Sequence, residues 1–427
     1  MSDAEAAAGV PRSRYLDVLR GIAILGILPA NLPSFALPIS NDDPAWVTGG
    51  GFHEVLVHQA TRLLFDQKFI TLFSLLFGAG LWVLRANAEA AGRGFAPRIL
   101  RRLGFLWGAG VAHAVFLWWG DVLAYYAIFG LLCCWAGGWE PRWLRLLGVI
   151  LILLPAVMLA LAVPVLWIAA PEVAQPPDPI LTPDGVVAAV HGSWGDFLSA
   201  LDRVWDTRFV AEVYRSGSYA RIMVVRTVHW AFMGVTVLVY YGWRIAGLFL
   251  IGLAWAKEGW LLRPEAHREK FRLLLRAGFV VGMPLQAASC ALDAGGWGGT
   301  AGAVLAELAQ YLGSIGLAAA YAGGVGLLCA RPALPRGFGL LAKVGRTAFS
   351  NYLLQSVLCT FVFYSYGLGW FGRLDRLELL GVGLAVWGIQ LGLTAWWMRH
   401  RSMGPLERLW RAVTNGEWTA ATKAAKY

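Results

Sequence analysis

Residues 110–126, GVAHAVFLWWGDVLAYY, place one histidine and one aspartate in an otherwise apolar stretch. An ionisable group inside a bilayer costs about 2.5–3.5 kcal/mol on insertion scales, so it usually marks function when its segment spans a membrane. An imidazole beside a carboxylate can act as a general base, because the carboxylate orients the ring and stabilises its protonated form. His113 and Asp121 therefore predict proton-transfer chemistry, provided that the segment is embedded in a membrane.

Both residues also have a structural interpretation, which the sequence leaves open. Asp121 follows Gly120 at a tight turn, and aspartate is a favoured cap for the N-terminus of a following helix. His113 could bond a backbone carbonyl of a neighbouring helix. The sequence has no GxGxxG, Walker, GxSxG or HExxH pattern in a usable context, and we expect no metal site.

Further polar residues interrupt apolar stretches elsewhere in the chain. They are Asn31, Lys68 with Asp66, Glu307 with Gln310, and the histidines His53 and His58. Lys68 and Asp66 are two residues apart and so lie on different faces of a helix. Glu307 and Gln310 are three residues apart and share a face, which is typical of the wall of a wet cavity.

The composition indicates what must position these residues. Of 427 residues, 58% are hydrophobic and only 15% are charged, and the mean hydropathy is +0.57. These values exclude an ordinary soluble domain and predict an all-α, polytopic bundle of membrane helices. The 22 tryptophans agree, since indole rings favour the membrane–water interface.

The net charge of +10 does not indicate a nucleic-acid partner, because Lys and Arg fall in short runs between apolar segments. Five cysteines lie in apolar stretches without C-x-x-C spacing. They are therefore interpreted as small buried residues rather than as disulfides or zinc ligands.

About 20 apolar residues are needed for one crossing, and we expect ten crossings. They lie near 15–38, 57–84, 99–119, 121–138, 143–170, 228–256, 271–292, 300–329, 340–367 and 377–398. The run 220–256 is long enough to hide a break. The chain divides into 1–14, a five-helix part 15–170, an extracytoplasmic segment 171–227, a C-terminal transmembrane part 228–412 and a tail 413–427.

Every second connection between these spans is basic, which predicts that both termini are cytoplasmic. On this topology His113 lies about 9 Å below the outer interface. The segment 171–220 is then external, and it reads as a Pro-rich loop followed by an amphipathic helix on the outer surface. It could cover an external opening or be a passive connector.

Five blocks of the sequence resemble the YeiB-like bacterial membrane family, and they recur in order over nearly the whole chain. The blocks are RYLDVLRGIAILGILPANLPSFALP, KFITLFSLLFGAG, RRLGFLWGAGVAHAVFLWWGDVLAYYAIFGLL, GRTAFSNYLLQSVLCTFVFYSYGLG and GPLERLWR. That family looks like a branch of the transmembrane acyltransferases, which include the lysosomal heparan-glucosaminide acetyltransferase and bacterial enzymes that O-acylate surface glycans.

The resemblance implies a multi-pass protein of the bacterial cytoplasmic membrane, among membrane lipids. It implies transfer of an acyl group from cytoplasmic acyl-CoA to an extracytoplasmic hydroxyl or amine, with a histidine at the reaction centre and no metal. His113, Asp121 and Tyr125 match one family block, and Asp17, Arg20 and Asn31 match the opening block. The lysosomal enzyme, however, places its histidine just before its second transmembrane helix, where this chain has His53 and His58, so the identity of the catalytic histidine stays open.

The CoA phosphates would need cations on the cytoplasmic side. The candidates are Arg98, Arg101, Arg102, Lys343 and Arg346, each of which could instead serve only as a topology determinant. Two other functions stay open. One is a solute or proton-coupled transporter with a path lined by His113, Asp121, Asn31 and Glu307. The other is a non-catalytic lipid-binding protein. Whether the chain forms a homo-oligomer also stays open.

Overall fold

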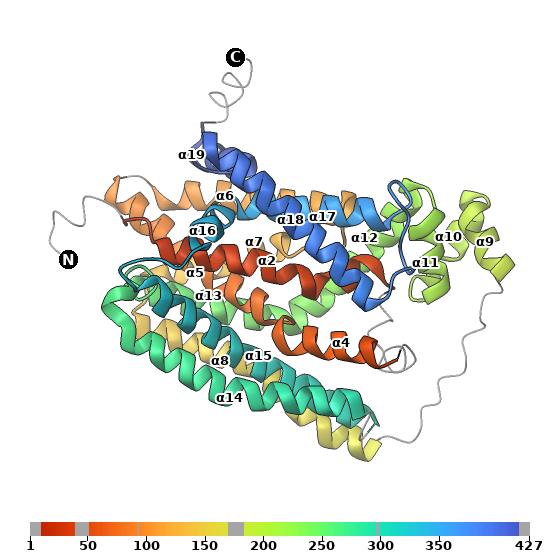
Figure 1. The fold of residues 1–427 in the computed structure, drawn as a ribbon, viewed down its shortest axis with the longest axis horizontal. Coiled ribbons are helices and arrows are strands. Elements are labelled where there is room, and N and C mark those ends of the chain that lie inside the picture. Colours follow the sequence, from red (N-terminus) through yellow and green to blue (C-terminus); the bar gives the residue numbers. More distant parts are fainter. Residues whose placement is uncertain (1–9, 39–50, 93, 170–182, 296–298, 418–427) are drawn as a thin grey trace.

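The computed structural model describes residues 10–38, 51–92, 94–169, 183–295 and 299–417. All regular structure in these ranges is helical, and the long helices run roughly along one axis of the molecule (Figure 1). The expected all-α fold is therefore confirmed.

Among the described residues, seven helices are long and apolar enough to cross a membrane. They are Arg14–Ala36, Phe52–Ala90, Pro141–Leu166, Tyr219–Lys257, Pro264–Gly295, Gly299–Cys329 and Arg376–His400. All seven coincide with expected spans. The other three expected spans are helical too, but Leu123–Gly138 and Ala348–Phe363 are shorter, and α6 (Phe95–Phe116) begins with three arginines. The chain is a multi-pass membrane protein, while the number of crossings stays a prediction.

Three of the spans are interrupted. The second divides into α4 (Phe52–Leu64) and α5 (Lys68–Ala90), because Gln67 has a left-handed backbone with φ 63°. The run that was long enough to hide a break contains one: α12 (Tyr219–Thr236) and α13 (Gly242–Lys257) are joined by a π-helical turn. The expected span 340–367 is instead α16 (Phe338–Arg346) and α17 (Ala348–Phe363).

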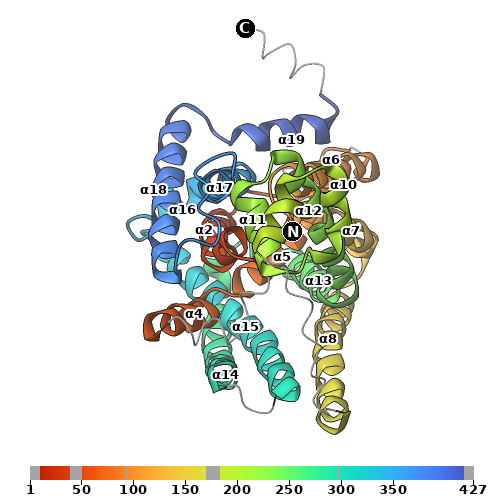
Figure 2. The ribbon, with the colours of Figure 1, turned by 90° about the vertical axis from the view of Figure 1, so that its right-hand side faces the viewer.

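The helix α2 (Arg14–Ala36) lies at the centre and packs against α16, α5, α17 and α18 (Arg376–His400). Glycines make its closest contact possible, since a Cβ on Gly21 or Gly345 would strike the backbone of the facing helix. Outside this group, α14 (Arg268–Gly295) and α15 (Gly299–Cys329) form a hairpin, and α8 (Pro141–Ala169) packs on α13 and α15 (Figure 2).

The described part of the segment that we expected to be external is not one surface helix but three short α-helices. These are α9 (Pro183–His191), α10 (Trp194–Ser199) and α11 (Thr207–Ser216), and α12 begins earlier than expected, at Tyr219. We call residues 183–216 the cap. Its buried Phe209, Val213 and Tyr214 form one hydrophobic cluster with residues of α2, α17 and the connection between α6 and α7. A lone amphipathic helix could not bury these side chains, so the cap packs onto the helix bundle. Residues 171–182 lie outside the described ranges.

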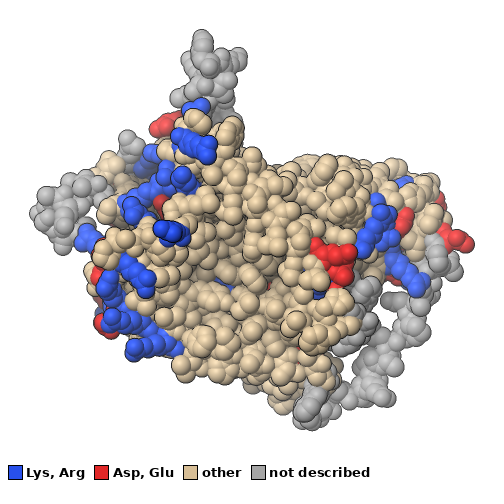
Figure 3. Space-filling view, in the orientation of Figure 1, with Lys and Arg blue, Asp and Glu red and all other residues tan. Residues whose placement is uncertain are grey.

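A smaller group of Lys and Arg lies near the cap, and a larger group lies at the opposite end of the molecule (Figure 3). At this end α2 and α6 begin, and α16 and α19 (Pro405–Asn415) lie there (Figure 1). We call it the basic end. Its basic residues belong to connections that the sequence predicts to be cytoplasmic, and the orientation of the chain in the membrane stays a prediction.

Candidate functional site

His113 and Asp121 are in direct contact. The Nδ1 of His113 lies 3.0 Å from Oδ1 of Asp121, and both side chains are buried. His113 is in the last turn of α6, and Asp121 is in the turn that leads to α7 (Leu123–Cys134). Because an ionised carboxylate only accepts hydrogen bonds, Nδ1 carries the hydrogen in a pair of ionised Asp121 and neutral His113, and Nε2 is then the acceptor.

Asp121 also caps the N-terminus of α7, which was the structural role that the sequence left open. Its second oxygen, Oδ2, accepts the backbone N–H of Ala124 at 2.8 Å, within the first turn of α7. Gly110 makes room for this arrangement, since a Cβ there would lie 2.7 Å from Oδ2 of Asp121 and even closer to the Ala124 nitrogen. One carboxylate therefore caps α7 and orients the imidazole.

The partner of the other imidazole nitrogen is Ser356 on α17. Its Oγ lies 2.7 Å from Nε2 of His113, and the serine is 1% exposed. With Nε2 as acceptor, the Ser356 hydroxyl donates, so Asp121, His113 and Ser356 form a continuous hydrogen-bonded chain across three elements. We call these three residues the triad. Sequence analysis missed Ser356, because it lies 243 positions from His113.

A cavity of about 340 Å³ leads from the basic end toward the triad. Its apolar walls come from α2, α5, α6, α7 and α17, and include Ile24, Ile27, Phe73, Leu76, Phe77, Leu81, Leu106, Leu123 and Phe349. Among its lining residues, Tyr352 and Val122 are the nearest to the triad. The Tyr352 ring is 5.0 Å from the imidazole ring, and Val122 follows Asp121. Tyr352 therefore separates the inner part of the cavity from His113.

The mouth of the cavity is strongly basic. It is lined by Arg12, Arg20, Arg102, Arg346 and Arg411, together with the carboxylates Asp17 and Glu407. Both carboxylates have partners: Asp17 is paired with Arg12 at 2.6 Å and Arg20 at 3.3 Å, and Glu407 caps α17 through the N–H groups of Phe349 and Ser350. The five guanidinium groups exceed the two carboxylates, which favours an anion at this mouth.

The five basic residues expected to bind phosphates divide into two groups. Arg102 and Arg346 line the cavity, and Arg102 stacks on Trp410 with its Cζ 3.7 Å from the ring. Arg98 donates to Asn415 at 2.7 Å and Arg101 to the Thr414 carbonyl at 3.3 Å, so both hold α19 in place. Lys343 is not among the residues that line the cavity.

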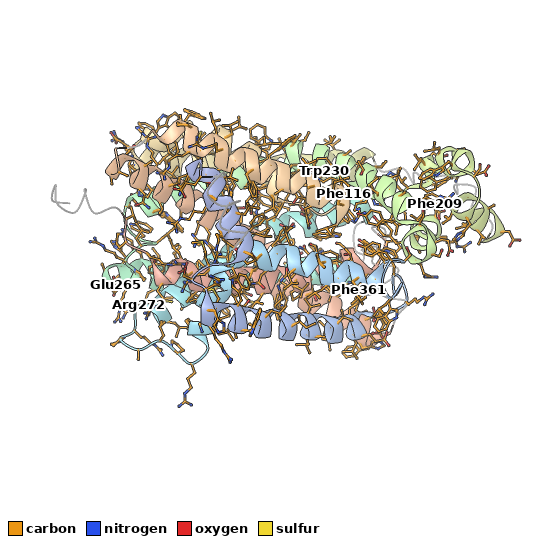
Figure 4. All side chains as sticks on the ribbon, turned by 90° about the horizontal axis from the view of Figure 1, so that it is seen from above. Phe116, Phe209, Trp230, Glu265, Arg272 and Phe361 are labelled. Atoms are coloured by element: carbon orange, nitrogen blue, oxygen red, sulfur yellow. The ribbon has the colours of Figure 1, made fainter. Side chains whose placement is uncertain are left out.

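Two further family-matched residues lie away from the triad's contacts. The Tyr125 hydroxyl donates to the Trp230 carbonyl at 3.3 Å and thus joins α7 to α12. Figure 4 labels Trp230 on α12 and Phe116 at the end of α6, two helices that pack against each other. Asn31 is half-buried in α2.

Lys68 and Glu307 belong to a second polar cluster, at the helix breaks. Lys68 is fully buried and donates to the Arg62 carbonyl, which the break between α4 and α5 leaves free, and to Gln286. Glu307 accepts from Gln67 at 3.0 Å and from the Tyr241 hydroxyl at 3.3 Å.

Arg244 completes this second cluster and was also missed. It donates to the Gln67 side chain at 2.7 Å and to Ser314 at 2.9 Å. Arg226, near the cap, is likewise fully buried, and it donates to the Leu117 carbonyl. Arg226 and Arg244 could both have been singled out from the sequence, because each is an isolated charge inside the apolar run 220–256.

The alternative histidines lie in other networks. His58 Nε2 is 3.2 Å from Asp293, and His53 is 3.8 Å from Glu54 and 3.7 Å from Asp375. Ligand atoms of His53, Glu54 and Asp375 all lie within 4.8 Å of one another. None of the three histidines lines the cavity, but His113 alone of them packs against a lining residue in the described ring contacts, with its ring centroid 5.0 Å from that of Tyr352.

Comparison with known proteins gives full-length relatives. The chain is 32% identical to the uncharacterized protein YeiB of Escherichia coli (strain K12) over 419 residues, covering 94% of this chain and 96% of that protein. The chain belongs to the YeiB family. It is also 29% identical to the uncharacterized protein YxaH of Bacillus subtilis (strain 168), with 97% of each chain covered.

Residues 255–417 match a family model described as "Protein of unknown function (DUF418)", and no solved structure matches the chain. The expected YeiB-like membership is therefore confirmed, whereas the connection to acyltransferases stays a prediction. In this YeiB family member, all five blocks that carried the resemblance contribute to the cavity lining, and two of them also supply the triad.

Proposed function

We propose that the protein is a transmembrane acyltransferase that uses acyl-CoA. The observation that carries this proposal is the cavity, which has a mouth of five arginines, apolar walls, and an inner end next to the histidine–carboxylate pair. Such a cavity suits a donor with an anionic head and an apolar arm. Arginines at the mouth would bind the phosphates, and the pantetheine arm would run along the apolar walls toward Tyr352.

The basic end would face the cytoplasm of a bacterium, as the positive-inside rule requires, with the cap on the outer side. Both termini would then be cytoplasmic, and the protein would reside in the cytoplasmic membrane. This orientation presents the cavity mouth to cytoplasmic acyl-CoA. Acceptors would reach the triad from the side of the cap.

The volume of the cavity constrains the acyl group. Binding sites for small ligands span roughly 300–1,000 Å³, and the cavity of about 340 Å³ is near the lower end of that range. It therefore favours a pantetheine arm that carries a short acyl group, such as acetyl, over a long-chain donor.

In the reaction, neutral His113 would act as a general base through Nε2. Asp121 would hold the tautomer and stabilise the imidazolium that forms when the proton is taken. The acceptor is a hydroxyl or an amine whose oxygen or nitrogen attacks the thioester carbonyl. The Asp121–His113 distance of 3.0 Å satisfies the geometric requirement for this orientation.

The test uses the full-length protein purified in detergent. We expect isothermal titration to show binding of acetyl-CoA, weaker binding of acetyl-pantetheine, which lacks the arginine-binding phosphates, and unchanged acetyl-CoA binding by His113→Ala. His58→Ala is the matched control, because His58 also pairs with a carboxylate, whereas His113 packs against the cavity-lining Tyr352. Absence of binding for acetyl-CoA and for longer acyl-CoA esters would overturn the proposal.

A transporter is the second candidate, and the helix breaks favour it. Discontinuous helices surround the substrate site in many transporters, and here the breaks at Gln67 and at Val237–Tyr241 meet at Glu307 and Arg244. This function predicts solute flux into liposomes without acyl-CoA, and loss of that flux in Glu307→Gln but not in His113→Ala.

A further inference from the structure

We infer that Ser356 is the nucleophile of the site and carries the acyl group as a covalent acyl-serine between donor and acceptor. This inference rests on the proposed acyl transfer but goes beyond it, since base catalysis by His113 alone needs no covalent step. It assigns an acylation site in α17, with a short-chain acyl thioester as the acylating substrate.

The hydrogen-bond geometry supports this role. The Ser356 hydroxyl donates to Nε2 of His113 at 2.7 Å, while the opposite nitrogen donates to Asp121 at 3.0 Å. This is the arrangement that activates a serine, because the proton leaves Oγ along an existing hydrogen bond as Oγ attacks. Ser74, another buried serine, shows the ordinary alternative, since it lies 2.8 Å from the carbonyl of Ile70, one turn earlier.

The position of Ser356 on α17 supports the same role. Ala348 and Tyr352 line the cavity, and they are spaced four residues apart, so they lie on one face of the helix. Ser356 continues that face by about one further turn, about 6 Å deeper. The next group that a thioester would meet beyond Tyr352, along this face, is therefore the Ser356 hydroxyl.

The two steps balance as follows. Ser356 Oγ attacks the thioester carbonyl carbon and gives its proton to His113, the C–S bond breaks, and the CoA sulfur leaves with the proton from the imidazolium. An acceptor hydroxyl or amine then attacks the ester carbonyl and gives its proton to His113. The bond to Oγ breaks, and Ser356 recovers its proton. No redox change and no further reactant are needed.

The covalent step also resolves the geometry of the two substrates. The donor would enter from the basic end, whereas the acceptor would come from the cap side, and Tyr352 and the packed cap leave His113 only 1% exposed. An acyl-serine removes the need for both substrates to occupy this space together. CoA can leave before the acceptor arrives, which is the order that ping-pong kinetics report.

The experiment is a single-turnover labelling of the full-length protein without acceptor. Protein in detergent is mixed with [¹⁴C]acetyl-CoA, denatured and analysed by intact mass and peptide mapping. We expect a covalent acetyl group on the peptide that contains Ser356, and a burst of free CoA of about one equivalent per chain. Alkaline hydroxylamine should remove the label, as it cleaves esters.

Four variants make the result decisive. Ser356→Ala and His113→Ala should lose the label while still binding acetyl-CoA, and Ser74→Ala should keep it. Ser356→Cys should form a thioester, which neutral hydroxylamine removes and the serine ester resists. If the fold of Ser356→Ala fails, the shift in hydroxylamine sensitivity of Ser356→Cys still identifies the acylated atom.

Two outcomes would overturn the inference, and they are distinguishable. If acetyl-CoA binds and its acyl group is turned over, but no label appears on Ser356 and Ser356→Ala keeps its turnover, the transfer is direct and only the acyl-serine is wrong. If no acyl-CoA binds, the proposed function fails together with this inference.

Discussion

Asp121→Asn is the substitution that tests the triad most directly. Asp121 accepts two hydrogen bonds, one from the Ala124 N–H at 2.8 Å and one from Nδ1 of His113 at 3.0 Å. An asparagine has one oxygen and one amino group, so it can keep only one of these acceptor roles. We expect its oxygen to keep the cap on α7, because the N–H of Ala124 cannot change its character, and its amino group to face Nδ1.

The substitution would then reverse the tautomer. With an NH₂ group as its neighbour, Nδ1 becomes the acceptor and Nε2 carries the hydrogen, so Nε2 can no longer accept the proton of Ser356 or of an acceptor. The lost stabilisation of the imidazolium contributes about 1.5–3 kcal/mol, and the wrong tautomer adds a comparable penalty. Together they amount to about 3–6 kcal/mol, or roughly 10²–10⁴-fold in kcat.

The assay is CoA release from acetyl-CoA, measured with a thiol reagent in detergent, together with the labelling of Ser356. Asp293→Asn is the matched control, because Asp293 also pairs with a histidine, His58, at 3.2 Å but lies outside the cavity lining. We expect full activity in the control and a similar melting temperature in both variants. A rate for Asp121→Asn within tenfold of the unsubstituted protein would refute the role of the triad.

Three further predictions test the cavity and the packing around it. Tyr352→Ala removes the ring that separates the cavity from His113, and should raise acetyl-CoA hydrolysis relative to transfer; unchanged hydrolysis in a CoA-release assay would contradict that role. The double substitution Arg102→Gln, Arg411→Gln should raise KM for acetyl-CoA at least tenfold, since each charged hydrogen bond contributes about 1.5–3 kcal/mol, but leave KM for acetyl-pantetheine unchanged. Gly110→Ala should lower the free energy of unfolding by about 1–3 kcal/mol, because the new Cβ would strike Ala124. Gly108 faces open space on the same helix, so Gly108→Ala should raise the free energy of unfolding by about 0.5–1 kcal/mol. Equal effects of the two substitutions in thermal unfolding would contradict this packing.

The sequence predicted the His113–Asp121 contact because the two residues are close in sequence across a tight turn. Their eight-residue separation spans the end of one helix and the start of the next, and both are conspicuous in apolar surroundings. Ser356 is different, since serines are common in membrane helices and usually bond the preceding turn, as Ser74 does. Only the packing of α17 against α6 brings Ser356 to His113, and no local pattern encodes that contact.

The break between α4 and α5 escaped prediction for a related reason. A break normally carries a glycine or proline, but the interruption between α4 and α5 has Gln67 in the left-handed region. Tertiary contacts hold it there: Arg244 binds its side chain and backbone carbonyl, and Lys68 binds the carbonyl of Arg62. The long apolar spans were predictable from hydropathy alone. The break at Gln67 depends on a hydrogen bond to Arg244, a residue more than 170 positions away.

The position of Asp121 at the start of α7 explains how a carboxylate can be held inside the bundle before any reaction occurs. A buried carboxylate beside a neutral imidazole carries an uncompensated charge, which is unfavourable in a medium of low dielectric constant. The N-terminus of α7 offsets part of this, because its aligned peptide dipoles and the N–H of Ala124 present partial positive charge to Oδ2. When His113 takes a proton, the remaining negative charge acquires a full counter-ion at 3.0 Å. In the proposed reaction, the electrostatic environment of the triad would therefore be more favourable in the transition state than at rest, which is the condition for catalysis.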